Sequence, residues 1–220
     1  MALENYTTYS EYDASGLVTV GANTLAVAGN NNKAFSVHKV FAAGHFSGDF
    51  EHVVAVALND DSSVSYAWCP FWGLSNETAE SAHSFKEIQA ASGDCLYVTQ
   101  YEAYESSIWI RLYEISTGTL YVDNWSYGEY DTWYYCEIER DESVGTYGTL
   151  ICRIYSDESR STLLDTLSVT LHEKEDFRTV YAVASYYPNS NRPYSQEIKN
   201  LDLQEAATIT ATGASTFPAT

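Results

Sequence analysis

Apolar and polar residues alternate with a period of two along residues 130–157, YDTWYYCEIERDESVGTYGTLICRIYSD, and this alternation most constrains the fold. Successive side chains of a strand point to opposite faces, so each arm of the stretch buries every second residue. The polar, glycine-bearing segment between the arms predicts a turn. The stretch therefore predicts an antiparallel hairpin whose buried face consists of Tyr134, Cys136, Ile138, Leu150, Cys152 and Ile154.

The register of this hairpin depends on the centre of its loop. A loop centred near Val144 places Ile138 opposite Leu150 and Cys136 opposite Cys152. The two cysteines are then cross-strand neighbours, with Cβ atoms roughly 4.5–5.5 Å apart. Buried free thiols are one interpretation, and a Cys136–Cys152 disulfide in a secreted protein is the other. The four cysteines are widely spaced without a CxxC pair, which argues against a zinc site.

Short β-prone segments, separated by Gly, Asn and Asp turns, follow one another along the rest of the chain. The pattern predicts about eleven to thirteen strands and one helix candidate, at residues 76–92 with Asn76 as its N-cap; a loop with one helical turn is the alternative there. Such a pattern is typical of a two-sheet antiparallel sandwich. We expect an N-terminal arm or edge strand at 1–16, one β-sandwich domain at 17–204 and a C-terminal tail at 205–220.

The charge of the chain argues against several classes of partner. The net charge is −19, from 30 acidic and 11 basic residues, and such a surface repels nucleic acid and anionic lipid. No apolar run approaches the roughly 20 residues that span a bilayer. The first residues, MALENYTTYSEYD, contain neither a basic segment nor an apolar one, so no signal peptide is expected in this numbering. We expect no nucleic-acid partner and no membrane span.

Several segments of the chain resemble a known architecture. They are FAAGHFSGDFEH (41–52), WGLSN (72–76), IERDESVGTYGTL with CRIYSD (138–157), LLDTLSVTLH with DFR (163–178) and NLDLQ (200–204). On these segments the chain is similar to concanavalin A-like jelly rolls of the laminin-G/legume-lectin type, and to uncharacterised bacteriophage and environmental bacterial proteins. The resemblance implies an all-β, two-sheet antiparallel jelly-roll sandwich with at most one short helix. It also implies an extracellular, cell-surface or virion location, and it brings no catalytic residues.

Glu137, Glu139 and Asp141 are spaced two residues apart and would share the outer face of the hairpin. Glycosidases of this architecture place acidic residues two apart on one strand, so that nucleophile and general acid lie about 5–5.5 Å from each other. The order of acids here departs from the ExDxxE or ExDxE pattern of those enzymes. A charged, solvated outer face beside Arg140 is the alternative. We assign no catalytic residue, and a glycosidase that uses Glu137 and Glu139 is the third functional hypothesis.

Three histidines, His45, His52 and His83, could suggest a metal site or a catalytic triad with Ser47 and Asp49. No GxSxG or HExxH motif accompanies them. Histidines scattered over strands in this way are typical of surface or packing positions, which is the interpretation that we favour.

Calcium is a further candidate, because laminin-G-like and lectin sandwiches often bind it through loop oxygens. The turns Asn59-Asp60-Asp61 and Asp157-Glu158 are rich in the oxygen ligands that calcium prefers. Acidic clusters of this size also arise from the composition alone. We therefore assign no cofactor and no metal ligand.

Large aromatic side chains are the remaining hint of a binding site. Alternation does not place all of them inward, and those left unassigned are Trp68, Phe71, Trp72, Trp109, Trp125 and Trp133. Sugar sites stack aromatic rings on the apolar face of a pyranose. Filling of the space between the sheets is the alternative for most of them. The candidate glycan-binding residues are Trp72, Trp125, Tyr127 and Tyr187.

Sequons at Asn5, Asn76 and Asn124 permit N-glycosylation in a secretory host. In a chain this rich in Asn, Ser and Thr, chance supplies about as many.

The tail at 205–220, EAATITATGASTFPAT, alternates β-branched residues but offers little apolar surface. Such a segment can be donated as a strand to an open sheet edge of a neighbouring subunit. A frayed terminus is the alternative. The residues expected in this assembly contact are Ala206, Thr208, Ile209, Thr210 and Phe217.

The leading functional hypothesis is a non-enzymatic structural subunit of an extracellular or virion assembly, such as a filament, tail or capsid-surface protein. Such a subunit would self-associate into a homo-oligomer or fibre. The alternative is a carbohydrate-binding adhesin module that contacts surface glycans.

Overall fold

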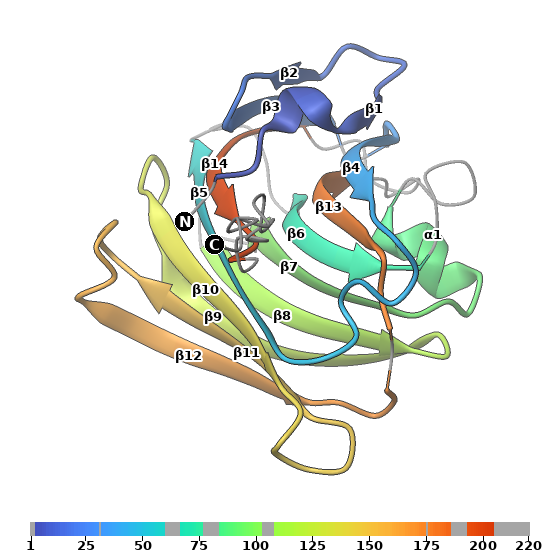
Figure 1. Ribbon diagram of the computed structural model, residues 1–220. Coiled ribbons are helices and arrows are strands. Elements are labelled where there is room, and N and C mark those ends of the chain that lie inside the picture. The colour runs from blue at the N-terminus through green and yellow to red at the C-terminus, as the bar shows by residue number, and fades with distance from the viewer. Residues whose placement is uncertain are drawn as a thin grey trace, which may run out of the picture.

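The computed structural model describes residues 3–30, 32–59, 67–76, 84–102, 108–174, 176–185 and 193–204, which form two antiparallel sheets of seven strands each (Figure 1). In spatial order, sheet A contains β1 (Ser10–Tyr12), β4 (Phe35–Val40), β13 (Thr179–Ser185), β6 (Trp68–Ser75), β7 (Cys95–Glu102), β8 (Ile108–Ser116) and β9 (Thr119–Gly128). Sheet B contains β12 (Leu163–Thr170), β11 (Thr149–Tyr155), β10 (Tyr134–Asp141), β5 (Phe50–Asn59), β14 (Pro193–Asp202), β3 (Thr24–Asn30) and β2 (Val18–Val20).

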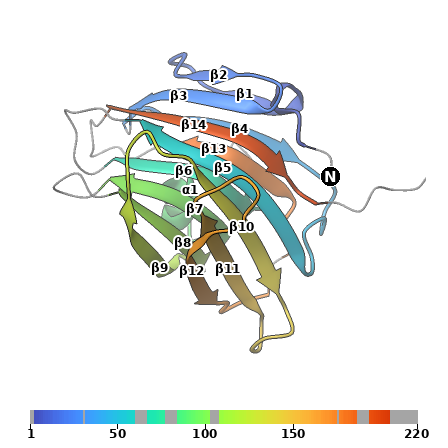
Figure 2. The ribbon, with the colours of Figure 1, turned by 90° about the vertical axis from the view of Figure 1, so that its left-hand side faces the viewer.

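The chain passes back and forth between the two sheets. Strands β6 to β9 form a meander in sheet A, and β10 to β12 form another in sheet B. Strand β13 then returns to sheet A between β4 and β6, and β14 enters sheet B between β5 and β3. Figure 2 shows sheet B toward the viewer and the helix α1 behind both sheets. The jelly-roll sandwich expected from the sequence is confirmed.

The central hairpin buries the face that alternation predicts, in a different register. Ile138 lies opposite Cys152, and Cys136 opposite Ile154, so the predicted pairing of the two cysteines is wrong by two residues. The loop between β10 and β11 is centred on Gly145, which has a φ of +81°, and not on Val144. Moving the loop centre by one residue shifts the register by two, and a shift of two leaves every side chain on its own face. The five residues predicted to share one interior are all 0% exposed: Cys136, Ile138, Leu150, Cys152 and Ile154.

The helix is shorter than expected. In place of a helix over 76–92 capped by Asn76, α1 spans Phe85–Ala90, and residues 77–83 lie outside the described residues. Ser84 is its N-cap, because the Ser84 hydroxyl accepts the backbone N–H of Glu87; the same hydroxyl donates to the Glu87 carboxylate. The described residues contain one more helical element, a short 3₁₀ turn, η1 (Tyr6–Thr8). Among the described residues, no helix is long and apolar enough to cross a membrane.

All four cysteines are free thiols in the interior, each 0% exposed. Burial raises the pKa of the Cys69 and Cys95 thiols well above its usual value. The pKa of Cys152 is also raised, first by a hydrogen bond with Cys136 and then by burial. The thiolate is the reactive form of cysteine, so these groups are chemically protected in the folded chain.

This protection gives a direct test of the interior. We expect Ellman's reagent to label native protein slowly and to release four equivalents of chromophore only after denaturation, because each of the four thiols is buried. Labelling is followed at 412 nm with and without guanidinium chloride. Rapid labelling of native protein, or only two equivalents after denaturation without reductant, would contradict this arrangement.

Candidate functional site

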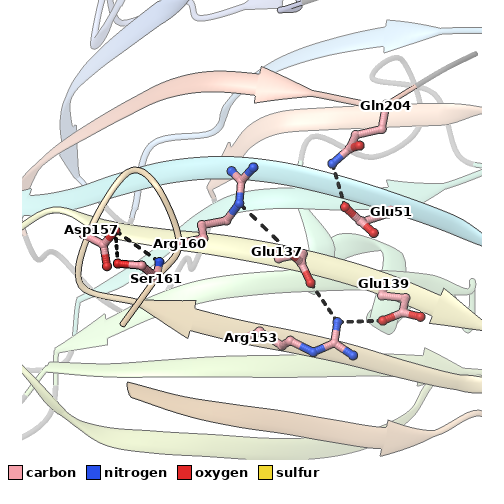
Figure 3. Close-up of polar contacts among 8 residues, drawn as sticks. All are labelled: Glu51, Glu137, Glu139, Arg153, Asp157, Arg160, Ser161 and Gln204. Atoms are coloured by element: carbon pink, nitrogen blue, oxygen red, sulfur yellow. Dashed lines mark hydrogen bonds and ion pairs between the residues drawn. The ribbon is translucent and has the colours of Figure 1, made fainter. Parts of the chain in front are cut away.

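The acidic residues considered for catalysis lie on the outer face of sheet B, where they pair with arginines (Figure 3). Arg153 Nη1 lies 2.9 Å from Glu137 Oε1 and 2.6 Å from Glu139 Oε2. Arg160 Nε lies 4.0 Å from the second oxygen of Glu137. Hydrogen bonds to Glu139 are the first cause of a raised pKa of Arg153, which keeps this cation charged.

The remaining members of this group have structural partners as well. The Asp141 carboxylate accepts hydrogen bonds from the backbone N–H and the hydroxyl of Ser143, at 2.8 and 2.6 Å, and closes the turn after β10. Arg140 points inward and is 1% exposed, with its Nη2 2.9 Å from Glu142 Oε1. These contacts favour the interpretation of a charged outer face over a glycosidase centre.

The calcium candidates are only partly described. The Asp157 carboxylate accepts hydrogen bonds from Ser159, Ser161 and Thr162 of its own loop, and these bonds lower the pKa of Asp157 well below its usual value. Asn59 Nδ2 lies 3.4 Å from Ser195 Oγ, whereas residues 60 and 61 lie outside the described part of the chain. Within the described residues, no three His, Cys, Asp or Glu side chains come together as metal ligands would.

Two of the three histidines meet at one end of sheet B. His45 and His52 line a cavity of about 510 Å³ together with Ser47, Asp49, Glu51 and Gln204, while residue 83 is not described. The His45 ring stacks on Phe41, with centroids 4.2 Å apart. His52 is 1% exposed and stacks on Phe50, with ring centroids 4.5 Å apart, as expected of a packing position.

The two tryptophans predicted to bind glycans are buried, and this prediction is corrected. Trp72 is 0% exposed and donates its Nε1–H to His52 Nδ1 at 3.1 Å. A bulge between Pro70 and Trp72 places two consecutive aromatic residues in the core. Trp125 is 8% exposed and packs edge-on against Tyr134, with centroids 5.3 Å apart.

The other predicted contact residues lie outside what the structure describes. They are the side chain of Tyr127, residue Tyr187, and the tail residues Ala206, Thr208, Ile209, Thr210 and Phe217.

The outer face of sheet A carries a row of aromatic rings under α1. Tyr113 pairs with Tyr97, Tyr97 with Gly73, and Gly73 with Tyr181, so these residues lie in line across four strands. Phe85 of α1 occupies the space above Gly73, where an added Cβ would lie 2.3 Å from Phe85 Cζ. Phe85 stacks on Tyr97 with centroids 4.5 Å apart, and Tyr97 stacks on Tyr113 at 4.6 Å. This stack attaches α1 to the sheet.

Beside this buried row lies a second, partly exposed one. Trp68, Tyr101 and Trp109 lie directly opposite one another on β6, β7 and β8, and all three side chains are partly exposed. The guanidinium carbon of Arg111 lies 4.0 Å from the ring centroid of Tyr101 and 4.9 Å from that of Trp109. The Trp68 ring lies 5.4 Å from the Tyr113 ring, centroid to centroid. We call these five residues, Trp68, Tyr101, Trp109, Arg111 and Tyr113, the Arg111 cluster.

The Arg111 cluster is positively charged in a chain of net charge −19. Arg111 Nη1 donates to the Tyr113 hydroxyl at 3.3 Å; burial raises the pKa of that hydroxyl, and the bond to Arg111 opposes the effect. Lys86 of α1 places its Nζ 5.0 Å from the ring centroid of Trp68, and burial lowers the pKa of Lys86. Two cations therefore border one group of aromatic rings.

The sequence analysis identifies only part of this cluster. Trp68 and Trp109 are among the aromatics that alternation leaves unassigned, whereas it does not single out Tyr101, Arg111 and Tyr113. The signal lies in β8, where an outward series alternates with inward Ile108, Ile110 and Leu112. The outward series is Trp109, Arg111 and Tyr113.

The buried His52 makes stability depend on pH. Burial, and secondly the charge of His45, lowers the pKa of His52 to about 3 in the folded protein. Below about pH 6.5 the unfolded chain binds a proton there that the folded chain does not, so the free energy of unfolding falls by about 1.4 kcal/mol per pH unit. We expect urea titrations to show that the free energy of unfolding of the wild-type protein falls more steeply between pH 6.5 and pH 5 than that of His52→Asn. The asparagine amide oxygen can still accept the hydrogen bond from Trp72.

The matched control is His172→Asn, because the side chain of His172 is 44% exposed. This variant retains the His52 contribution to the pH dependence. If the free energy of unfolding depends on pH in the same way for wild type and His52→Asn, the imidazole at position 52 is not buried in its neutral form.

The architecture is shared with solved structures, although no protein-family model and no curated protein matches the chain. A legume lectin-like domain from Entamoeba histolytica superposes with a TM-score of 0.56 at 10% identity, covering 88% of each chain. The PL-14 alginate lyase from Aplysia kurodai gives 0.54 at 9% identity, covering 89% of this chain and 90% of the lyase.

A phage protein contains the same architecture. Tailspike protein 2 of Escherichia coli O157:H7 bacteriophage CAB120 gives a TM-score of 0.51 at 10% identity, over 87% of this chain and 26% of the tailspike. Likeness at this level of identity concerns the fold alone. The chain therefore has the concanavalin A-like jelly-roll fold, which these lectin-like, lyase and tailspike structures share.

Proposed function

We propose that this chain is a carbohydrate-binding protein that holds its ligand on the outer face of sheet A, at the Arg111 cluster. The proposal keeps the adhesin hypothesis and moves its site away from the buried Trp72 and Trp125. It is a proposal for binding without catalysis, in an extracellular, cell-surface or virion setting.

The observation that carries the proposal is the row of three partly exposed rings on adjacent strands, Trp68, Tyr101 and Trp109. Aromatic faces pack on the apolar face of a pyranose, and a few polar groups beside them fix its orientation. Arg111 and Lys86 supply hydrogen-bond donors next to these rings. Tyr97, Tyr113 and Phe85 form a buried base, so the rings are supported on a rigid sheet.

The outer face of sheet B offers a weaker case. Its acids and arginines are engaged with one another, and Lys199 lies 3.9 Å from the Trp133 ring centroid. A ligand there would have to break existing ion pairs. The lectin-like domain and the tailspike among the similar structures are compatible with a glycan ligand, and they support the proposal as analogies of fold.

A glycan array, followed by titration calorimetry with the best binder, tests the proposal. We expect Trp109→Ala and Trp68→Ala to weaken binding about tenfold each, since each removes one stacking surface. Trp133→Ala is the matched control, because it removes a partly exposed tryptophan with its own neighbouring cation from the opposite face. An equal loss of glycan affinity in all three variants, or an array without any binder, would contradict the assignment of the site to the Arg111 cluster.

We infer as a second candidate that the chain is a structural subunit that self-associates through an edge of sheet B. Strand β12 lies at this edge and pairs with β11 on one side only, although two of its backbone N–H groups, those of Thr166 and Ser168, already donate to the carboxylates of Asp165 and Asp123. Leu163 and Leu164 are 52% and 41% exposed there, and exposed apolar edge strands favour pairing with another chain. The likeness to part of a tailspike supports a place in a larger assembly.

Sedimentation velocity at micromolar concentration tests this second role. We expect the wild-type chain to sediment as a dimer or larger, and Leu164→Lys to shift it toward monomer by placing a charge on the edge. Val144→Lys is the control, because Val144 is 51% exposed in the β10–β11 loop, which lies beside the opposite end of β12 from Leu164. A wild-type chain that stays monomeric would exclude association through β12.

A further inference from the structure

We propose that the saccharide bound at the Arg111 cluster carries a carboxylate, as uronic acids and sialic acids do, and that Arg111 recognises this group. The inference rests on the proposed sugar-binding function and names the class of sugar. It is drawn from how Arg111 is partnered.

Arg111 has donors to spare. A guanidinium carries five N–H donors, and the hydrogen bond that the structure gives Arg111 runs from Nη1 to the Tyr113 hydroxyl at 3.3 Å. Its Nε is buried without an acceptor among the described residues, and none of their carboxylates lies within 4.0 Å of it. Leaving a buried charged donor unsatisfied is costly, so an incoming acceptor is favoured.

Other arginines in the same chain are partnered differently. Arg140, Arg153 and Arg160 each lie within 4.0 Å of a glutamate. Arg111 instead lies between two aromatic rings, which orient a guanidinium without neutralising its charge. Its positive charge therefore remains available to an anion, in a protein whose net charge is −19.

The surroundings of Arg111 reinforce this preference for an acceptor. Trp109 Nε1 is likewise buried without a hydrogen-bond partner in the described part of the chain. Lys86 adds a second cation beside Trp68. The cluster thus presents mainly donors, and a small turn of the Arg111 or Trp109 side chain toward a ligand would give them the acceptor that they lack.

A carboxylate matches this set of donors. It is planar, charged and accepts through two oxygens that pair with the two-pronged edge of a guanidinium, whereas a sugar hydroxyl is neutral and accepts through a single oxygen. Uronic acids bring such a group within a polysaccharide backbone, and sialic acids bring it at a chain end. Both sources share the chemistry, and the experiment below distinguishes them.

The test compares ligands that differ only in the carboxylate. Oligogalacturonate is compared with its methyl ester, and sialyllactose with its methyl ester, by titration calorimetry with the wild-type protein. We expect the acid of one pair to bind about tenfold or more tightly than its neutral counterpart. The pair that shows the difference identifies the source as uronate or sialate.

Variants then assign the effect to Arg111. Arg111→Gln should remove the preference for the acid while binding of the neutral ligand is retained, and Arg111→Lys should keep part of it, because it retains the charge without the planar fork. Arg153→Gln is the matched control, since it removes an arginine from the opposite face and should leave the preference unchanged. Near-ultraviolet circular dichroism checks that each variant is folded.

The outcomes separate this inference from the function on which it rests. Equal affinity for acid and ester by the wild-type protein overturns carboxylate recognition and leaves the carbohydrate-binding proposal standing. Binding of neither member of any pair, together with an array without a binder, overturns both. Because the acid-to-ester comparison uses the wild-type protein, it decides the matter even when a variant fails to fold.

Discussion

Burial of one face of every central strand is the constraint on which this structure depends. Five inward residues of β10 and β11, from Cys136 to Ile154, are 0% exposed, and they pack against the inward side chains of sheet A. Each apolar side chain taken from water contributes about 1.5–3 kcal/mol, so the two inner faces hold the sheets together. Because strand side chains alternate, fixing the inner face also fixes which residues face outward.

The two outer faces that result have different chemistry. Sheet B carries acids and arginines that are engaged with one another, such as Arg153 with Glu137 and Glu139. Sheet A carries aromatic rings, part of them buried under α1 and part of them accessible around Arg111. A paired surface is well solvated and has little reason to hold a ligand, whereas an arginine on aromatic rings retains unused binding capacity. For this reason the proposed site lies on sheet A.

The fold was readable from the sequence because alternation is a local signal. The same five residues of the central hairpin were placed inward without knowledge of the register, which depended on a loop centre one residue from the expected one. Two of the four glycan candidates, Trp72 and Trp125, are buried, and for Trp72 the reason is an irregularity of its strand. The bulge after Pro70 places both Phe71 and Trp72 in the core. Proline inside a central strand is a local hint of a bulge, but alternation alone does not show which neighbouring side chains the bulge turns inward.

The proposed site was also only half visible from the sequence. Alternation places Trp109, Arg111 and Tyr113 on one side of β8, yet it does not reveal that Trp68 and Tyr101 lie beside them. Those neighbours follow from strand pairing over long separations along the chain. Alternation also does not reveal that Arg111 lacks an acidic partner among the described residues. The presence of such a partner depends on which strands lie beside β8.

Gly73 has an effect beyond its own strand. Since it carries only a hydrogen atom, the Phe85 ring can rest against the backbone of β6, and the neighbouring Lys86 is thereby held over Trp68. A larger residue at position 73 would lift the helix and carry this amine away with it. The size of residue 73, which lies beneath the helix and out of reach of a ligand, would then affect the selectivity of the proposed site through the position of Lys86.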